Sequence, residues 1–379
     1  MLIFGIGGNI DDIGGVETSI KALITACGAN EPITLVCHAH KDSKTTQYQP
    51  PSNTDLNIIE YTARSWKKSP LPEIYRKLYA NNPNSCVICR HHRHVIAAAS
   101  AGFKTVYLVP SMIHSQVRTE LAGPLNIEKL RLVAFGILNH WSQKSALRLA
   151  SRVAAFSVTM KRQISRVVSE PSLKAPILLC KPGIDNTRFY PGTAAERQSL
   201  RTKFQVPDGS LCLVIVSRLV AGKGIELAIQ AMQSLGKGYH LMIIGDGLRR
   251  PHYQELAQRC KPGISVHFWG AQSNVEELYR CADIFLMTSK AESLGQTILE
   301  AGASGLPIIA FSKQAGVTTA TEELSLGDYV TFAHHYSVDA LTEAILRSRT
   351  KHATPAQIHD YFRSQFHWPT LLEELKQAC

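Results

Sequence analysis

The chain has 379 residues, of which 45% are hydrophobic and 7% aromatic. Such values are typical of a globular protein that is too long for one ordinary core and suits two domains. The start, MLIFGIGGNIDD, lacks the basic and long apolar segments of a signal peptide, and no apolar run approaches the roughly 18 residues of a membrane span. The nine cysteines are scattered singly apart from Cys86 and Cys89, which predicts no disulfide framework and favours a reducing cytoplasm.

The formal net charge of +11 is concentrated in one part of the chain. Between Tyr61 and Ile164, sixteen Lys or Arg residues face three acidic residues. A surface of this kind attracts an anionic partner: a phospholipid surface, a lipid-diphosphate acceptor or nucleic acid. Within it, residues 65–79 (SWKKSPLPEIYRKLY) suit either an interfacial helix or an ordinary solvated one. A nucleic-acid-binding protein is one alternative, although stacking aromatics among the charges and a known reader motif are lacking.

The first predicted strand, Leu2 to Ile6, leads into a glycine-rich loop. Gly14 and Gly15 then precede a helix with apolar residues at helical spacing. A dinucleotide fingerprint, and with it a nucleotide-dependent oxidoreductase, is a second alternative. The G-x-G-G pattern that begins at Gly5 argues against it, because Ile10 stands where the third glycine of G-x-G-x-x-G would fall.

The segment SCVICRHHRHVIAAA invites a zinc-binding interpretation. Two residues separate Cys86 from Cys89, and three histidines follow. A buried strand explains this apolar run better, since no second cysteine pair lies nearby. The histidines would then fall on the loop that follows the strand, where a ligand can bind. The next predicted strand, Val106 to Val109, places His114 on a loop at its carboxyl end.

A proline- and glycine-punctuated stretch, KPGIDNTRFYP, occupies residues 181–191 and precedes a polar segment. Such stretches are typical of domain boundaries. We therefore predict a first domain over residues 1–184 and a second over 185–357.

The second domain opens with a predicted strand at Leu211 to Val216. Arg218 and Lys223 follow it, flanking a glycine-containing turn just before a helix. Two fixed cations beside a helix N-terminus are suited to a departing nucleoside diphosphate, whose charge grows as its bond to a sugar breaks.

Residues 282–311 (ADIFLMTSKAESLGQTILEAGASGLPIIAF) predict strand, loop, helix, turn and strand. Ser293 fits a helix N-cap, with Gln296 completing a capping box. Glu292 then lies in the loop just before the cap, and Glu300 lies inside the helix.

This placement suits a sugar or phosphate ligand. The first-turn amides of Leu294, Gly295 and Gln296, which would have no partners within the helix, can hold an anion or a hydroxyl-rich rim. Gly295 has no side chain to keep a ligand away from the backbone. A carboxylate such as that of Glu292 or Glu300 can accept two hydrogen bonds side by side, as the vicinal hydroxyls of a ribose or hexose require.

The stretch resembles the E-x7-E signature of the family 4 retaining glycosyltransferases, with S-x2-E-S-x-G before it and EA-x2-S-G-x-P after it. Other segments are similar to the family as well: GGVE, SVTMKRQI, the R-x4-K-G pattern and GDG. The resemblance implies an α/β protein with the GT-B fold, in which two Rossmann-like domains face each other across a cleft. It also implies that a C-terminal helix, residues 358–379, packs back on the acceptor-binding first domain.

The resemblance further implies roles for individual residues. Glu292 would address the transferred sugar, Glu300 the nucleotide ribose, and Gly15 the donor diphosphate. His114 would lie near the reacting face of the sugar. The complete predicted set is His114 and Glu292 as catalytic residues, with Gly15, Arg218, Lys223, Gly245, Gly270, Ser293, Leu294, Gly295 and Glu300 as donor-binding residues; of these, Gly270 would meet the nucleobase.

The expected function is the transfer of a hexose or N-acetylhexosamine, with retention, from a UDP- or GDP-sugar to a saccharide or lipid-linked acceptor in cell-surface polysaccharide or glycoconjugate synthesis. No Asp-x-Asp pair occurs in the chain, so we expect no metal, and no other cofactor. We expect a cytoplasmic protein, free or peripherally bound to the inner face of the membrane, with no nucleic-acid partner.

Overall fold

The computed structural model describes the chain except residues 13, 29–30, 40–46, 63–68, 114–126 and 350–352, together with the side chains of residues 127–135. The chain divides into two compact units. Unit 1 comprises Met1–Gly183 and His367–Cys379, and unit 2 comprises Ile184–Phe366.

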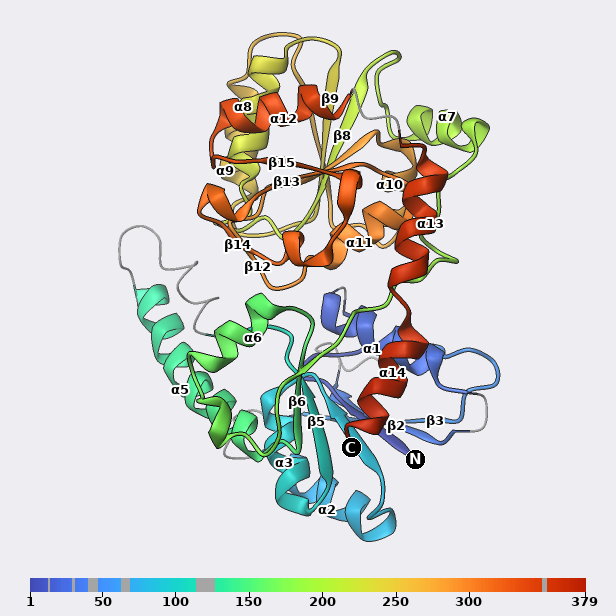
Figure 1. The fold of residues 1–379 in the computed structure, drawn as a ribbon, viewed down its shortest axis with the longest axis vertical. Helices are drawn as coiled ribbons and strands as arrows, with labels where there is room; N and C mark the ends of the chain where they lie inside the picture. Colours follow the sequence, from blue (N-terminus) through green and yellow to red (C-terminus); the bar gives the residue numbers. More distant parts are fainter. Residues whose placement is uncertain (13, 29–30, 40–46, 63–68, 114–126, 350–352) are drawn as a thin grey trace. The chain divides into compact units, whose positions relative to one another are not determined.

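Unit 1 is built on a parallel sheet whose described strands follow the order β3-β2-β1-β4-β5-β6-β7 (Figure 1). These strands are Leu56–Tyr61, Ile33–His38, Leu2–Gly5, Cys86–Cys89, Lys104–Leu108, Arg152–Ala155 and Leu178–Leu179. Most of them are near-continuous apolar runs, as expected where helices cover both faces of a parallel sheet. The strand order reverses between β1 and β4, which makes this the switch point of the sheet.

Helices cover the sheet of unit 1. In α1, the apolar residues Ile20, Leu23 and Ile24 recur at helical spacing and are all buried. The described helices are α1 Gly15–Ala26, α2 Leu71–Asn81, α3 His92–Ala101, α5 Ile127–Leu149, α6 Val158–Ser165 and α14 Trp368–Gln377, with a short 3₁₀ helix at Glu170–Ser172.

Unit 2 repeats this plan with a parallel sheet in the order β10-β9-β8-β11-β13-β15. The strands are Ser265–Gly270, Tyr239–Ile244, Leu211–Val216, Ile284–Met287, Ile308–Phe311 and Val330–Ala333. The helices are α7 Ala194–Lys203, α8 Ile225–Leu235, α9 Arg250–Gln258, α10 Val275–Cys281, α11 Gln296–Ala303, α12 Val338–Ser348 and α13 Pro355–Gln365, with 3₁₀ turns at Lys313–Ala315, Thr321–Leu324 and Gly327–Tyr329. A separate parallel pair joins β12, Ala291–Glu292, to β14, Thr318–Thr319.

The C-terminal segment corrects one expectation. Residues 358–379 were predicted as one helix on the first domain, but they divide between the units. α13 packs on α11 within unit 2, where the Phe362 ring lies so close to Gly302 that a Cβ there would meet it at 2.2 Å. The helix is interrupted after Gln365, and a new helix, α14, begins at Trp368 with His367 as its N-cap and Pro369 in its first turn. Only α14 belongs to unit 1.

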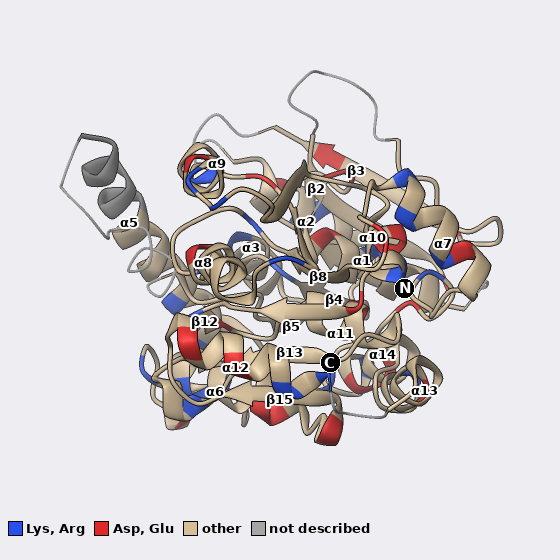
Figure 2. Cartoon of the chain, turned by 90° about the horizontal axis from the view of Figure 1, so that it is seen from above, with Lys and Arg blue, Asp and Glu red and all other residues tan. Residues whose placement is uncertain are grey.

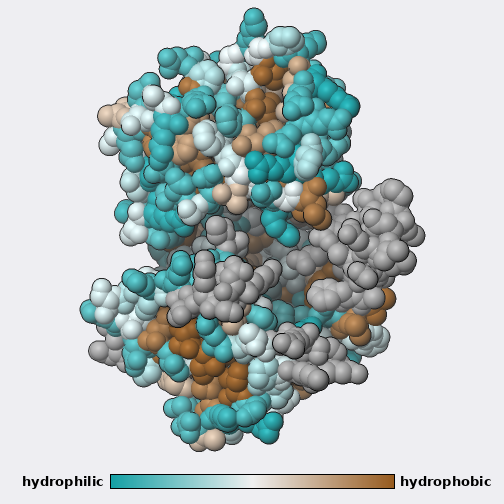
Figure 3. All heavy atoms as spheres, turned by 180° about the vertical axis from the view of Figure 1, so that it is seen from behind, coloured by the Kyte–Doolittle hydropathy of each residue, from teal (hydrophilic) through white to brown (hydrophobic). Residues whose placement is uncertain are grey.

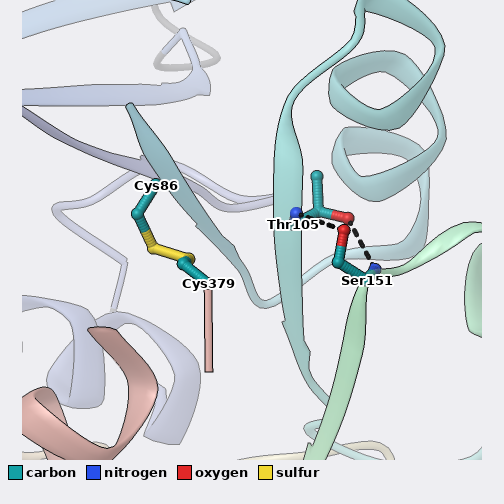
Figure 4. Close-up of a disulfide and its surroundings, with 4 residues drawn as sticks. All are labelled: Cys86, Thr105, Ser151 and Cys379. Carbon is teal, nitrogen blue, oxygen red and sulfur yellow. Dashed lines mark hydrogen bonds between the residues drawn. A yellow bond between two sulfur atoms is a disulfide. The ribbon is translucent and has the colours of Figure 1, made fainter. Parts of the chain in front are cut away.

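A disulfide joins Cys86 in β4 to Cys379, with 5.7 Å between their Cα atoms (Figure 4). The scattered cysteine spacing, which predicts no disulfide framework, does not indicate this bond. Two cysteines 293 positions apart give no local spacing pattern, so only the fold could bring them together. The same view shows Thr105 and Ser151 exchanging backbone-to-side-chain hydrogen bonds of 3.1 and 3.4 Å.

Positions of Lys and Arg and of Asp and Glu are distributed over both units (Figure 2). On the face shown in Figure 3, most described residues are hydrophilic and hydrophobic residues gather in a few patches. Of the large apolar residues that are exposed, Ile137, Leu138 and Trp141 lie together on α5. Among the described residues, no helix has the length and apolar character needed to cross a bilayer.

Candidate functional site

The predicted donor-binding residues of unit 2 gather at the switch point of its sheet. β8 and β11 are neighbours there, although β9 follows β8 in sequence. Two loops leave the carboxyl ends of these strands: residues 217–224, which lead into α8, and residues 288–295, which lead into α11. In open α/β sheets, ligands bind at this position.

Two hydrogen bonds connect these loops to each other. The Thr288 hydroxyl donates to the Lys223 carbonyl at 2.7 Å, and the Lys290 amide donates to the Gly222 carbonyl at 2.8 Å. Gly224 has a φ of +66°, and a Cβ on it would lie 2.1 Å from the Thr288 carbonyl oxygen. Only glycine fits there, so Gly224 allows the two loops to approach each other this closely.

Lys223 and Glu292 form an ion pair between Nζ and Oε2, with 16% and 24% of their side-chain surfaces exposed. The pairing of β12 with β14 fixes the backbone of Glu292, whose carbonyl accepts from the Ala320 amide at 3.1 Å. The structure thus brings together two of the predicted residues. A phosphate or sugar hydroxyl that enters here meets a positioned cation and a positioned carboxylate at once.

The start of α11 differs from the prediction. Ser293 is not the N-cap: the helix begins at Gln296, and its N-cap is Gly295, with φ +80° and ψ +64°. The physical reason is that β12 holds residues 291–292 extended, so the chain needs a left-handed turn at Gly295 to enter the helix. Ser293 and Leu294 therefore lie in the loop before the helix, and the first helical amides are those of Gln296 and Thr297.

Glu300 lies in the second turn of α11, where the Tyr279 hydroxyl donates to its Oε2 at 3.2 Å. Burial raises the pKa of the Glu300 carboxyl to about 7, while the Tyr279 hydrogen bond and the charge of Arg188 act in the opposite direction. This carboxyl therefore changes its protonation state near neutral pH.

The other predicted residues of unit 2 line the same edge of the sheet. Arg218 is exposed directly after β8. The Gly245 amide donates to the Gly270 carbonyl at 2.7 Å, which joins the loops after β9 and β10. A Cβ on Gly245 would lie 1.9 Å from the Ser217 carbonyl oxygen, so this glycine lets the loops after β8 and β9 approach closely.

Two predicted residues are not placed beside this group. Gly15 is the first residue of α1 in unit 1, exposed and with no atom within 4 Å of a Cβ built on it. His114 lies outside the described residues. Their predicted roles are proposals that the unit 2 geometry does not address.

Sequence reasoning missed Tyr279 and Arg188. Tyr279 belongs to α10, which carries no motif that would single it out. Arg188 was visible in the boundary segment, and its Nε donates to Glu276 Oε2 at 2.9 Å. A buried acid implies a polar partner, but sequence alone does not reveal which one.

The histidines after β4 also differ from expectation. Only His91, the N-cap of α3, lies in the loop, while His92 and His94 are inside the helix and buried. The His94 ring lies between the Tyr75 and Tyr61 hydroxyls, at 2.9 and 3.0 Å. This packing explains their position without a ligand.

Residues 196–364, which lie within unit 2, match the family model described as glycosyl transferases group 1. A mannosylfructose-phosphate synthase of Agrobacterium fabrum is 31% identical over 161 residues, or 39% of this chain and 35% of that protein. A GDP-mannose-dependent alpha-(1-6)-phosphatidylinositol monomannoside mannosyltransferase of Mycobacterium tuberculosis is 29% identical over 224 residues, or 56% of this chain and 57% of that protein. The match thus spans between about a third and somewhat over half of these relatives' lengths.

Among solved structures, Anabaena Alr3699/HepE in complex with UDP and glucose superposes with a TM-score of 0.74 at 15% identity, covering 99% of this chain and 98% of that one. The chain therefore has the GT-B fold, with two Rossmann-like domains. Residues 196–364 of its second unit match the model of the glycosyl transferases group 1 family, in agreement with the predicted resemblance. The oxidoreductase and nucleic-acid-binding alternatives find no support in these matches.

Proposed function

We propose that the protein is a retaining, metal-independent glycosyltransferase. It moves a hexose or N-acetylhexosamine from a nucleotide-diphosphate sugar to a saccharide or lipid-linked acceptor in the synthesis of cell-surface polysaccharide or glycoconjugate. The observation that carries this proposal is the Lys223–Glu292 ion pair at the switch point of unit 2, beside the start of α11.

In this mechanism the side chains of unit 2 have separate tasks. Lys223 and Arg218 neutralise the diphosphate as the bond between the anomeric carbon and the phosphate oxygen breaks. Glu292 and the 293–295 loop orient the transferred sugar, and Glu300 binds the ribose hydroxyls. The acceptor oxygen attacks on the same face, and its proton passes to the departing phosphate oxygen.

We propose that these cations, with the first amides of α11, replace a metal in neutralising the leaving group. The absence of an Asp-x-Asp pair from the sequence supports this. Transfer should be undiminished by excess EDTA, and a loss of activity that Mg²⁺ or Mn²⁺ restores would contradict the metal-independent route.

The names of similar proteins suggest donors and acceptors to try first. One relative is named for GDP-mannose, and a structural neighbour was solved with UDP and glucose. Both cited relatives are named for a phosphate-bearing compound. We therefore propose UDP- or GDP-sugars as donors and include phosphate-bearing sugars among the acceptors.

The direct test combines binding with product analysis. Thermal-shift screening against UDP, GDP and ADP and their common sugars identifies the donor, because a ligand that binds only the native state raises Tm. NMR of the product from the matching donor then reports the anomeric configuration. An inverted product would contradict the retaining mechanism, and the failure of every nucleotide to bind would contradict the function.

We also propose that unit 1 contacts an anionic membrane through α5. The exposed Ile137, Leu138 and Trp141 lie on this helix, and Lys144 Nζ lies 5.4 Å from the centre of the Trp141 ring. An apolar face with adjacent cations suits the interface of an anionic bilayer. Flotation with vesicles rich in phosphatidylglycerol should exceed flotation with neutral vesicles, and Leu138→Ser with Trp141→Ser should abolish the difference. Equal flotation with both vesicle types would contradict the proposal that unit 1 binds an anionic membrane.

A further inference from the structure

The switch point of the unit 1 sheet holds a buried arginine that the proposed mechanism does not use. Arg90 directly follows β4, and its amide donates to the carbonyl of Gly5, at the end of β1, at 2.9 Å. β1 and β4 are the neighbouring strands at which the order of this sheet reverses. Arg90 therefore occupies in unit 1 the position at which open α/β sheets bind ligands.

The guanidinium of Arg90 has no hydrogen bond or ion pair to any described residue. The residue is 5% exposed, and its Nε and Nη1 are buried without a partner. Among the described residues, the guanidinium lies over the Phe156 ring, with Cζ 5.3 Å from the ring centre. Burial lowers the pKa of Arg90 to about 10, so the side chain is still charged at neutral pH. A buried charge without a counter-charge is costly, and such groups are normally paired.

The surrounding groups do not supply that counter-charge. Burial raises the pKa values of Tyr107 and of the Cys180 thiol to about 12, so both are neutral. Glu17 on α1 is the one charged group among the neighbours that act on Arg90, and it forms no ion pair with it in the described chain. Glu374 on α14 also acts on Cys180, and its Oε2 is itself buried without a partner among the described residues.

Glu17 is directed toward the glycine-rich loop instead. A Cβ on Gly8 or on Gly14 would lie 2.9 or 2.5 Å from its carboxylate oxygens. The Glu17 carboxylate thus lies against these two glycines and forms no ion pair with the guanidinium in the described chain. The Nε and Nη1 donors of Arg90, which are buried without a partner, are left for a ligand oxyanion.

We propose that Arg90 binds the phosphate or carboxylate group of a substrate at the switch point of unit 1. The inference rests on the proposed function, because the substrate is a partner in glycosyl transfer. Two sources share this chemistry: an anionic group on the acceptor, and the diphosphate of the donor.

The test measures anion binding without requiring transfer. Tm shifts and calorimetric Kd values are recorded with inorganic phosphate, glucose 6-phosphate, neutral glucose and UDP. Wild type is compared with Arg90→Gln, Arg90→Lys and Arg166→Gln, the last being a matched control because Arg166 is exposed at the end of α6. We expect phosphate and glucose 6-phosphate to raise the Tm of wild type and of Arg166→Gln, and their affinity to fall at least tenfold in Arg90→Gln.

Arg90→Lys and one further variant, Glu17→Gln, keep the result interpretable. Arg90→Lys retains the charge but loses the planar fork, so it should fold and bind phosphate several-fold more weakly. Glu17→Gln removes the neighbouring negative charge and should strengthen phosphate binding. If UDP loses affinity in Arg90→Gln as much as phosphate does, the anion is the donor diphosphate; if UDP is unaffected, the anion belongs to the acceptor.

The proposal is overturned if wild type shows no shift with tens of millimolar phosphate, or if Arg90→Gln and Arg90→Lys bind phosphate as well as wild type does. Its failure is distinguishable from failure of the proposed function. Arg90-dependent phosphate binding without any transfer would refute the function alone, whereas transfer with anion binding indifferent to Arg90 would refute this inference alone.

Discussion

The Lys223 ammonium group and the Glu292 carboxylate hold each other in place, with most of both side chains out of solvent. We predict that Lys223→Ala lowers the transfer rate by about 10²–10³-fold, the range seen when one positioned charge-stabilising donor is removed. Steady-state kcat and KM for the preferred nucleotide sugar measure this. The matched control is Lys290→Ala, an exposed lysine in the same pair of loops, which should change kcat less than threefold. Equal losses in both variants would show that general surface charge matters rather than this ion pair.

We predict that Glu300 makes nucleotide binding depend on pH. If its carboxylate accepts hydrogen bonds from ribose hydroxyls, the ionised form binds best. Because its pKa is raised to about 7, nucleotide affinity should rise several-fold between pH 6 and pH 8. Calorimetric titration of UDP or GDP across this range measures the change. Glu300→Gln should bind more weakly at pH 8 and show a flat profile, and an unchanged wild-type slope in this variant would rule Glu300 out as the titrating group.

The same raised pKa has a consequence for stability. Since the folded-state pKa lies above the ordinary value, the native protein binds the Glu300 proton more tightly than the unfolded chain does. The stabilisation from this group is therefore complete below about pH 4.5 and is lost as the pH rises through about 7. The Tm of Glu300→Gln, relative to that of wild type, should accordingly be higher at pH 8 than at pH 5.

The loop before α8 packs closely against the loop after β11, and Gly224 makes this close approach possible. Gly224→Ala would place a methyl group 2.1 Å from the Thr288 carbonyl oxygen in a left-handed conformation, so we expect a loss of about 1–3 kcal/mol in the free energy of unfolding. Gly209→Ala is the control, because Gly209 has a φ of +68° and no atom within 4 Å of a Cβ. The Gly209→Ala variant therefore has the strain of an alanine in a left-handed conformation but no steric collision. Urea unfolding of both variants separates the two effects, and equal losses would contradict the steric account.

Most strands of unit 2 could be predicted, because they are strong apolar runs with a clear end. The strand at Ile284–Met287 and the helix containing Glu300 were both predicted and are both present. The helix start was misplaced by two residues for a tertiary reason: β14, more than twenty residues further along, pairs with β12 and keeps Glu292 extended. Local capping rules favoured Ser293 as the N-cap, but such rules do not take into account a strand partner so far along the chain.

The residues predicted to bind the ligand show the same limit. The sequence indicated which residue types could bind a nucleotide sugar, and Lys223 and Glu292 do meet. It could not show that Glu300 is buried against Tyr279, nor that Arg90 lacks a partner, because both facts depend on helices and loops packed from separate parts of the chain.

Across the whole chain, the disulfide and the nucleotide should act on different units. Cys86 and Cys379 both belong to unit 1, where the bond fastens the end of α14 to β4. Trp368, Leu371, Leu372 and Leu375 of α14 are buried in the core of that unit, and Lys376 pairs with Glu31 at 2.6 Å. Packing therefore holds the helix even without the bond, and Cys379→Ser should weaken unit 1 by about 2–4 kcal/mol without unfolding it.

Calorimetry can resolve this, because two units with separate cores can unfold in separate transitions. We predict that Cys379→Ser, or dithiothreitol added to wild type, lowers one transition, while the preferred nucleotide raises the other. Cys260→Ser, which removes a free cysteine of unit 2, is the control and should leave the dithiothreitol-sensitive transition in place. If the nucleotide and the reductant move the same transition, either the units do not unfold independently or the nucleotide also binds unit 1, as it would if Arg90 held the donor diphosphate. Repeating the measurement with Arg90→Gln separates these two outcomes. If the shared transition persists in that variant, α13 and α14, which follow each other along the chain at Phe366 and His367, would be the first connection to interrupt by mutation.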